Sequence, residues 1–136
     1  MGRRKRMNAE KRKEVRKNII FSSLKNIRIS CRKIRIIADL IRNMNAIKAL
    51  AVLKYNKKKN ISIQLGKVLL STISNWKIKN KNSDDSNLYI KEIKVDVARF
   101  IKRIQPAAQG RIHRIKKYSA HVSIALHYKK NIWDIK

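Results

Sequence analysis

Side chains able to carry out catalysis are few in this chain, which has 136 residues, three histidines and one cysteine. His113 lies in a strongly basic stretch, His121 opens a segment of alternating apolar residues, and His127 falls on its polar side. None has an acid nearby in the sequence to orient it as a general base. No His/Cys pair has metal-site spacing, and no glycine-rich phosphate loop occurs. Unless folding gathers distant acids, we expect no enzymatic activity, no metal and no cofactor.

The other reactive candidates are Cys31 and the adjacent acids Asp84 and Asp85. Cys31 falls where a helix is expected to start, and we interpret it as a small filler. A lone cysteine excludes an internal disulfide and suits a reducing compartment. The two acids lie in a polar stretch, residues 80–87, rich in turn-forming residues. Without further ligands they make a poor metal site.

The charge balance suggests what the chain binds. It has 36 Lys+Arg against 8 Asp+Glu, a net charge of +28. Repulsion between so many like charges destabilises the compact state, and proteins with this composition usually bind nucleic acid, which neutralises the charge. An anionic membrane surface is the alternative. No apolar run approaches the roughly 18–20 residues that span a bilayer. The basic N-terminus lacks the apolar region of a secretory signal, so we expect none.

Seven of these Lys and Arg residues lie in residues 97–118, which contain no acid. The only proline, Pro106, and Gly110 mark a turn, because proline fixes φ and glycine accepts φ > 0. Isoleucines on both sides predict two arms of a β-hairpin. The basic side chains are Arg99, Lys102, Arg103, Arg111, His113, Arg114, Lys116 and Lys117. The tip comprises Gln105, Pro106, Ala107, Ala108, Gln109 and Gly110.

The length and charge of this hairpin predict that it is not stable without a partner. Ten extended residues reach roughly 33 Å, and an isolated two-stranded hairpin is marginal in water. An arm this cationic also repels itself. We therefore expect it to lie against a large polyanion that stabilises it. The alternative is an ordinary surface hairpin with a solvated charged face.

The residues before the hairpin predict the body that carries it. Alternation predicts a strand over 23–29, with Ile27 and Ile29 on one face and Leu24 on the other. Ser30 is expected to cap an amphipathic helix running to about Asn43. The first turn of this helix carries Arg32, Lys33 and Arg35. Positive charge there opposes the helix dipole, but it suits a site that meets phosphate.

Further elements follow along the chain. Asn45 is expected to open a short helix, and a long helix covers about residues 58–79. A strand begins at Leu88, followed by the hairpin and by a strand over 122–128. In the first of these strands, Tyr89, Ile93, Val95 and Val97 are predicted to share one face and Ile90 to occupy the other. In the last strand, Val122, Ile124, Leu126 and Tyr128 alternate with polar or small residues.

These elements predict an α+β fold: three helices packed on a small antiparallel sheet, one long extended β-hairpin and a basic N-terminal arm. Residues 1–20 are predicted to be a basic extension, 21–128 a single domain that includes the hairpin 97–118, and 129–136 a loose tail. A helix capped by Asn8 could form from Ala9 to Lys17. We expect the extension to be disordered alone and to order on a polyanion. An unstructured solubilising extension is the alternative.

The element order and several motifs resemble the bacterial large-subunit ribosomal protein twenty-two family. Residues 29–42, ISCRKIRIIADLIR, are similar to the family's ISPRKxRLVADLIRG, and 102–111, KRIQPAAQGR, to its KRxxPRAxGR. Residues 46–53, 69–75 and 119–124 also match. Cys31 replaces the usual proline and Asn43 a glycine. Ala107 stands where a basic residue is usual and Gln109 where one is often found, so the tip has less charge than the family pattern.

The resemblance implies a structural protein of the large ribosomal subunit that binds ribosomal RNA, assists assembly and is monomeric in the particle. It implies that the hairpin tip lines the nascent-peptide exit tunnel. Neighbouring ribosomal proteins and the nascent polypeptide would be partners; a membrane or a small-molecule substrate would not. The location implied is the cytoplasmic ribosome, in a bacterial or an organellar source. The RNA-binding residues of the body would be Arg28, Ser30, Arg32, Lys33, Arg35 and His121.

Two other classes of protein share the basic composition. A DNA-compacting architectural protein could insert a proline-tipped arm into a minor groove. Such proteins are usually symmetric dimers, so dimerisation and a preference for duplex DNA would favour this class. A membrane-surface protein would expose the apolar stripe of its helices, whereas here the stripe of the long helix is better explained as core.

Overall fold

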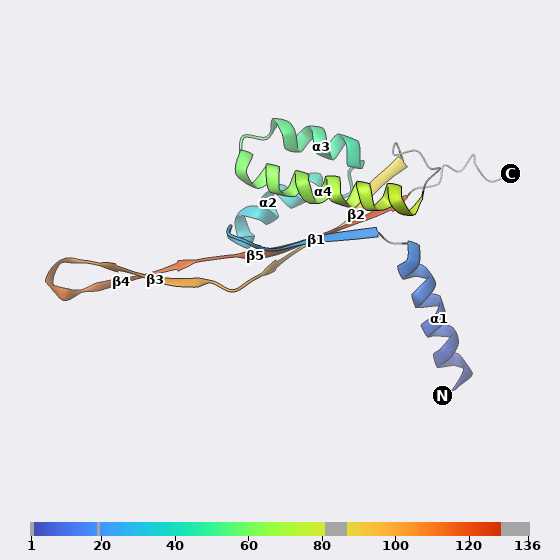
Figure 1. Cartoon of the computed structure of the whole chain (residues 1–136), viewed down its shortest axis with the longest axis horizontal. Coiled ribbons are helices and arrows are strands. Elements are labelled where there is room, and N and C mark those ends of the chain that lie inside the picture. The colour runs from blue at the N-terminus through green and yellow to red at the C-terminus, as the bar shows by residue number, and fades with distance from the viewer. Residues whose placement is uncertain (1, 19, 81–86, 129–136) are drawn as a thin grey trace.

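The computed structural model describes residues 2–18, 20–80 and 87–128. Helices α2, α3 and α4 lie on one side of a three-stranded sheet (Figure 1). The two-stranded sheet projects from one end of this body, and α1 leaves at the other (Figure 1). The elements are α1 (Arg3–Asn18), β1 (Ile20–Ile27), α2 (Cys31–Ile41), α3 (Ala46–Tyr55), α4 (Lys59–Lys79), β2 (Leu88–Val97), β3 (Ile101–Pro106), the 3-10 turn η2 (Ala108–Gly110), β4 (Ile112–Lys117) and β5 (Ala120–Tyr128).

Strand β5 is the centre of the three-stranded sheet, which has the order β1-β5-β2 and is antiparallel throughout. Val122, Ile124 and Leu126 are fully buried beneath the helices, and Tyr128 is half-buried, as their alternation predicts. Because β2 and β5 pair along their length and lead into β3 and β4, the body holds both arms of the hairpin.

Strand β1 differs from its prediction in its bounds and in which side chains point toward the core. It begins at Ile20 rather than at residue 23, and its register with β5 shifts between Leu24 and Ile27. Asn26 has φ 59°, a left-handed conformation that asparagine tolerates better than most residues. The extra residue of this bulge lets both Leu24 and Ile27 pack on the core. The predicted placement of these two residues on opposite faces was therefore wrong.

Strand β2 contains a second bulge with the same effect. Its register with β5 shifts between Ile90 and Glu92, and Lys91 is exposed there. Ile90 and Ile93 are consequently both buried, although alternation predicted opposite faces for them. Val97, predicted to share the face of Ile93, is exposed at the end of the strand.

Local signals placed the starts of α2 and α3, although Ser30, at the N-cap position of α2, does not make the predicted side-chain capping hydrogen bond. Helix α2 buries Ile34, Ile37, Ala38 and Ile41, as its apolar stripe predicts, and ends at Ile41 rather than near Asn43. Asn43 has φ 60°, so the helix cannot continue through it. At the start of α3, the Asn45 side-chain oxygen accepts a hydrogen bond of 2.9 Å from the Ile47 N–H. The cap predicted for Asn45 is confirmed.

Helix α4 packs on β1, β5, α2 and α3 and supplies much of the core. The rings of Trp76 and Tyr128 stack with centroids 5.9 Å apart. The Thr72 hydroxyl donates to the Val68 carbonyl at 2.7 Å and contacts the Ser22 hydroxyl, which joins α4 to β1. The residues that α4 buries are Ile61, Ser62, Leu65, Val68, Leu69, Thr72, Ile73 and Trp76.

The N-terminal arm is helical over a longer stretch than predicted. Helix α1 begins at Arg3 rather than at Ala9, and its residues through Lys13 are exposed. Arg6 and Glu10, one turn apart, form an ion pair of 3.1 Å. Most of the predicted loop 80–87 and the whole tail 129–136 lie outside the described residues.

Candidate nucleic-acid interface

The hairpin forms as a separate two-stranded sheet, β3–β4, because residues 98–100 interrupt the pairing that joins β2 to β5. At its tip, the Ala107 N–H donates to the Arg111 carbonyl at 2.9 Å. Gln109 and Gly110 have φ values of 59° and 71°. The turn predicted between Pro106 and Gly110 is therefore present, and a glutamine shares its left-handed conformation.

The register of this hairpin places cations on both of its faces. Residues directly opposite each other share a face. Lys102 lies opposite Lys116, and Arg114 follows on the same side. Arg103 and Lys117 occupy the other side, together with His113. All of these side chains are exposed, so the hairpin presents positive charge in both directions perpendicular to its plane.

The pairing of Lys102 with Lys116 works against the isolated hairpin. Like charges directly opposite each other destabilise a strand pair. Within the described residues no helix packs extensively on this strand pair, because β3 and β4 contact chiefly each other and point away from the body (Figure 1). Ile104 and Ile112 are exposed as well. A strand pair with this repulsion and this exposed apolar surface is expected to be ordered when negative charge surrounds it.

The root of the hairpin, residues 98–100 and 118–119, is braced by contacts that the sequence did not predict. The rings of Phe100 and Tyr118 are 6.0 Å apart and inclined by 49°. The Lys116 ammonium lies 5.3 Å from the centre of the Phe100 ring, within cation–π range. The Ala98 N–H donates to the Ser119 carbonyl at 2.9 Å. One aromatic residue at the base of each arm was the available signal.

A cleft of about 500 Å³ lies between this root and the start of α2. Ser30 lines it at the N-cap position of α2, and its side chain makes no capping hydrogen bond. The first N–H groups of a helix lack intrahelical partners and favour anions. The cleft thus brings body and hairpin residues together, and its cationic lining is Arg28, Lys33, Arg103, Lys116 and Lys117.

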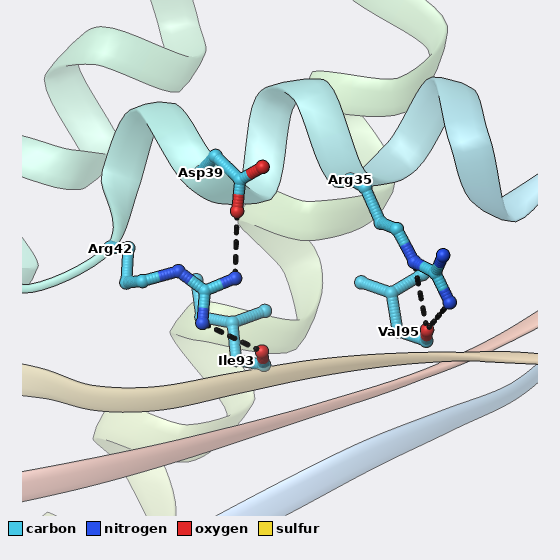
Figure 2. A network of polar contacts seen from close by, with 5 residues as sticks. All are labelled: Arg35, Asp39, Arg42, Ile93 and Val95. Carbon is cyan, nitrogen blue, oxygen red and sulfur yellow. Dashed lines mark hydrogen bonds and ion pairs between the residues drawn. The ribbon is translucent and has the colours of Figure 1, made fainter.

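Two other arginines, one on α2 and one directly after its end, contact the backbone of the fold instead (Figure 2). The Arg35 guanidinium donates from Nε and Nη2 to the Val95 carbonyl, at 3.3 and 3.0 Å. Arg42 donates to the Ile93 carbonyl at 3.4 Å and to Asp39 at 2.7 Å. Together they fasten α2 to the backbone of β2, an edge strand of the sheet. The role of Arg42 was not predicted from the sequence, and the RNA-binding role predicted for Arg35 stays a prediction.

Other predicted residues lie apart from the cleft lining. The His121 Nδ1 accepts a hydrogen bond of 3.1 Å from the Asn26 N–H, so this half-buried ring holds the bulge of β1. Arg32 is exposed on the first turn of α2 and does not line the cleft. Their contact with nucleic acid remains a prediction.

Among residues 2–18, 20–80 and 87–128, no three His, Cys, Asp or Glu side chains are grouped as a metal site would require. No helix within these ranges combines the length and apolarity needed to cross a membrane.

Comparison with known proteins gives a consistent result. The family model described as ribosomal protein L22p/L17e matches residues 22–127. A large ribosomal subunit protein uL22 from Christiangramia forsetii is 46% identical over 133 residues, covering 96% of this chain and 98% of that protein. The protein of the same name from Bacteroides fragilis strain YCH46 is 43% identical over 135 residues, covering 98% of each chain. The one from Porphyromonas gingivalis is 44% identical over 125 residues, covering 91% and 92%.

Proposed function

Because the chain belongs to the ribosomal protein L22p/L17e family and is a structural protein of the bacterial large ribosomal subunit, we propose that its hairpin is an RNA-dependent anchor. In this proposal β3–β4 passes between segments of ribosomal RNA that neutralise both of its faces. The observation that carries it is the charge pattern: cations on both faces, with Lys102 opposite Lys116. Family membership decides against the DNA-compacting and membrane-surface alternatives.

The cleft at the hairpin root would hold RNA backbone. Its lysines and arginines, beside the N-terminus of α2, suit phosphates rather than base edges. Recognition would accordingly depend on RNA shape and backbone path. The exposed basic helix α1 would add a further contact at the opposite end of the body (Figure 1).

The tip, residues 105–110, would then line the nascent-peptide exit tunnel. Its residues include no side chain charged at neutral pH, unlike the arms behind it. A neutral tip can face a moving polypeptide without holding it electrostatically, while the arms bind RNA. We further propose that the protein is monomeric in the particle, assists subunit assembly and contacts neighbouring ribosomal proteins.

A salt titration tests the anchor. Arg103, Arg111 and Arg114 are replaced together by Ala, and binding to a large-subunit RNA fragment is measured against salt concentration. Losing three phosphate contacts should make the log–log slope less steep by about 2–3. The control removes equal charge from the α3–α4 side, at Lys54, Lys59 and Lys67, and should leave the slope nearly unchanged. Equal slopes for the hairpin variant and the wild type, with undiminished entry into subunits, would refute the anchor.

A further inference from the structure

A second surface lies on the helical side of the body, away from the hairpin tip (Figure 1). Helices α3 and α4 pack side by side, and a groove of about 620 Å³ runs between them. Its apolar lining includes Leu50 and Leu53 from α3 and Ile63 and Leu70 from α4. Ile63 and Leu70 remain 54% and 53% exposed, so the described chain leaves this surface only partly covered.

Gly66 creates the hollow in this surface. It lies on α4 between Ile63 and Leu70, one helical turn from each, and it lines the same groove. A Cβ added at Gly66 would meet nothing within 4 Å. The glycine is therefore not required for a close crossing of two helices, and the space beside it is open to a side chain from elsewhere.

The groove also contains an unsatisfied polar atom. Ser62 lines it and is only 2% exposed, and its hydroxyl is buried without a hydrogen-bond partner among the described residues. A buried hydroxyl without a partner costs free energy that a suitable acceptor or donor would recover.

The rim of the groove is positively charged. Lys54, Lys59 and Lys67 line it, and residues 40–83 contain no acid. A second copy of this chain, itself at +28, would be repelled. RNA would find phosphate partners in the lysines but would leave the leucines and isoleucines poorly covered. Apolar side chains flanked by carboxylates complement both features of the groove.

We propose that the α3–α4 groove is a docking site for an acidic amphipathic helix of another protein of the particle. Apolar side chains spaced i, i+3/i+4, i+7 on the partner would fill the hollow at Gly66 and pack on Leu53 and Ile63. Its flanking Asp or Glu side chains would meet the lysine rim. The site is independent of the RNA-binding hairpin, on the other side of α4 from the sheet.

A labelled peptide tests this with the full chain. The probe is a 16-residue helical peptide with Leu at i, i+3/i+4, i+7 and Glu on its flanks, titrated by fluorescence anisotropy in ~0.3 M salt to screen unspecific attraction. Two control peptides replace Leu by Ser or Glu by Lys. The proposal expects the probe to bind at least about tenfold more tightly than either control, with one peptide per protein.

Variants locate the binding. Gly66→Leu should fill the groove and weaken peptide binding about tenfold, because the added side chain has open space and suits a helix. The control Ile78→Glu adds charge at a 75% exposed position of α4 that does not line the groove, and it should weaken binding less than threefold. RNA affinity should be equal in both variants.

Three results would overturn the proposal. The first is equal peptide affinity for the Gly66→Leu variant and the wild type. The second is RNA binding that Gly66→Leu weakens, which would assign the groove to RNA. The third is self-association in sedimentation that Gly66→Leu abolishes, which would assign it to a second copy.

Discussion

Replacing Lys102 by Glu should stabilise the hairpin of the free protein and weaken the protein's binding to RNA. In the wild type, Lys102 lies directly opposite Lys116 on an exposed, otherwise unsupported strand pair. The variant converts a like-charge pair into an opposite-charge pair, a change of about 1 kcal/mol in favour of the hairpin. That corresponds to about a fivefold smaller equilibrium constant for the local opening of β3–β4 that exposes its amides to hydrogen exchange. The gain should shrink in high salt, because both side chains are exposed.

Binding to RNA should weaken in the same variant. A glutamate cannot contact phosphate, and it repels the strand it faces. The log–log salt slope should become less steep by about 1. A hairpin that is better ordered in the free protein yet binds RNA less well is expected only if its charge serves the partner.

The matched control is Lys117→Glu. Lys117 lies on the same strand pair but opposite Ile101, so the control makes the same charge change without relieving a like-charge pair. Amide hydrogen exchange of the free protein and RNA binding are measured for both variants. Both should lose RNA affinity, but only Lys102→Glu should gain protection. Equal protection in the two variants, or undiminished RNA binding by Lys102→Glu, would refute the reasoning.

Two further predictions concern the body. Arg35→Ala should destabilise the protein to urea by about 1–2 kcal/mol, because it removes a charged donor from the Val95 carbonyl, whereas Arg32→Ala should cost less than about 0.5 kcal/mol. If the two variants unfold at the same midpoint, the carbonyl contact does not stabilise the fold. Gly66→Ala should stabilise it by about 0.5–1 kcal/mol, since alanine favours helix and its Cβ meets nothing within 4 Å. A lower urea midpoint for this variant would show that the helix needs the glycine.

Local signals in the sequence were enough for the three helices of the body, the central strand and the turn of the hairpin. Asn45 caps α3 through its own side chain, and the turn depends on Pro106 and Gly110, which are four residues apart in the sequence. The stripe of α2 has the helical period along its length. Each of these features is decided within a few neighbouring residues, so composition and spacing suffice to predict them.

The bulges and the lining of the cleft could not be predicted in this way. One extra residue near Asn26 and one at Lys91 reverse the facing of the residues that come after each bulge, and a period-two pattern gives no sign of the insertion. The cleft joins residues 28–33 to both arms of the hairpin, a meeting that depends on how the segments pack. Likewise, only the packing of α2 on β2 shows that Arg35 contacts the Val95 carbonyl.

Residues 98–100 and 118–119 interrupt the pairing between the two sheets. The direction in which the hairpin leaves the body and the ordering of its strands therefore depend on different contacts. Two contacts at the root set the angle at which the arms leave the body. They are the hydrogen bond from the Ala98 N–H to the Ser119 carbonyl and the packing of the Phe100 ring on that of Tyr118. Within the described chain, no residue between Val95 and Ala120 belongs to the core cluster. The body can therefore complete its core without the hairpin, while the hairpin beyond its root relies chiefly on its own strand pairing against the repulsion of its charges. A protein built in this way can meet the RNA with a folded body already in place and let the hairpin order as RNA closes around it.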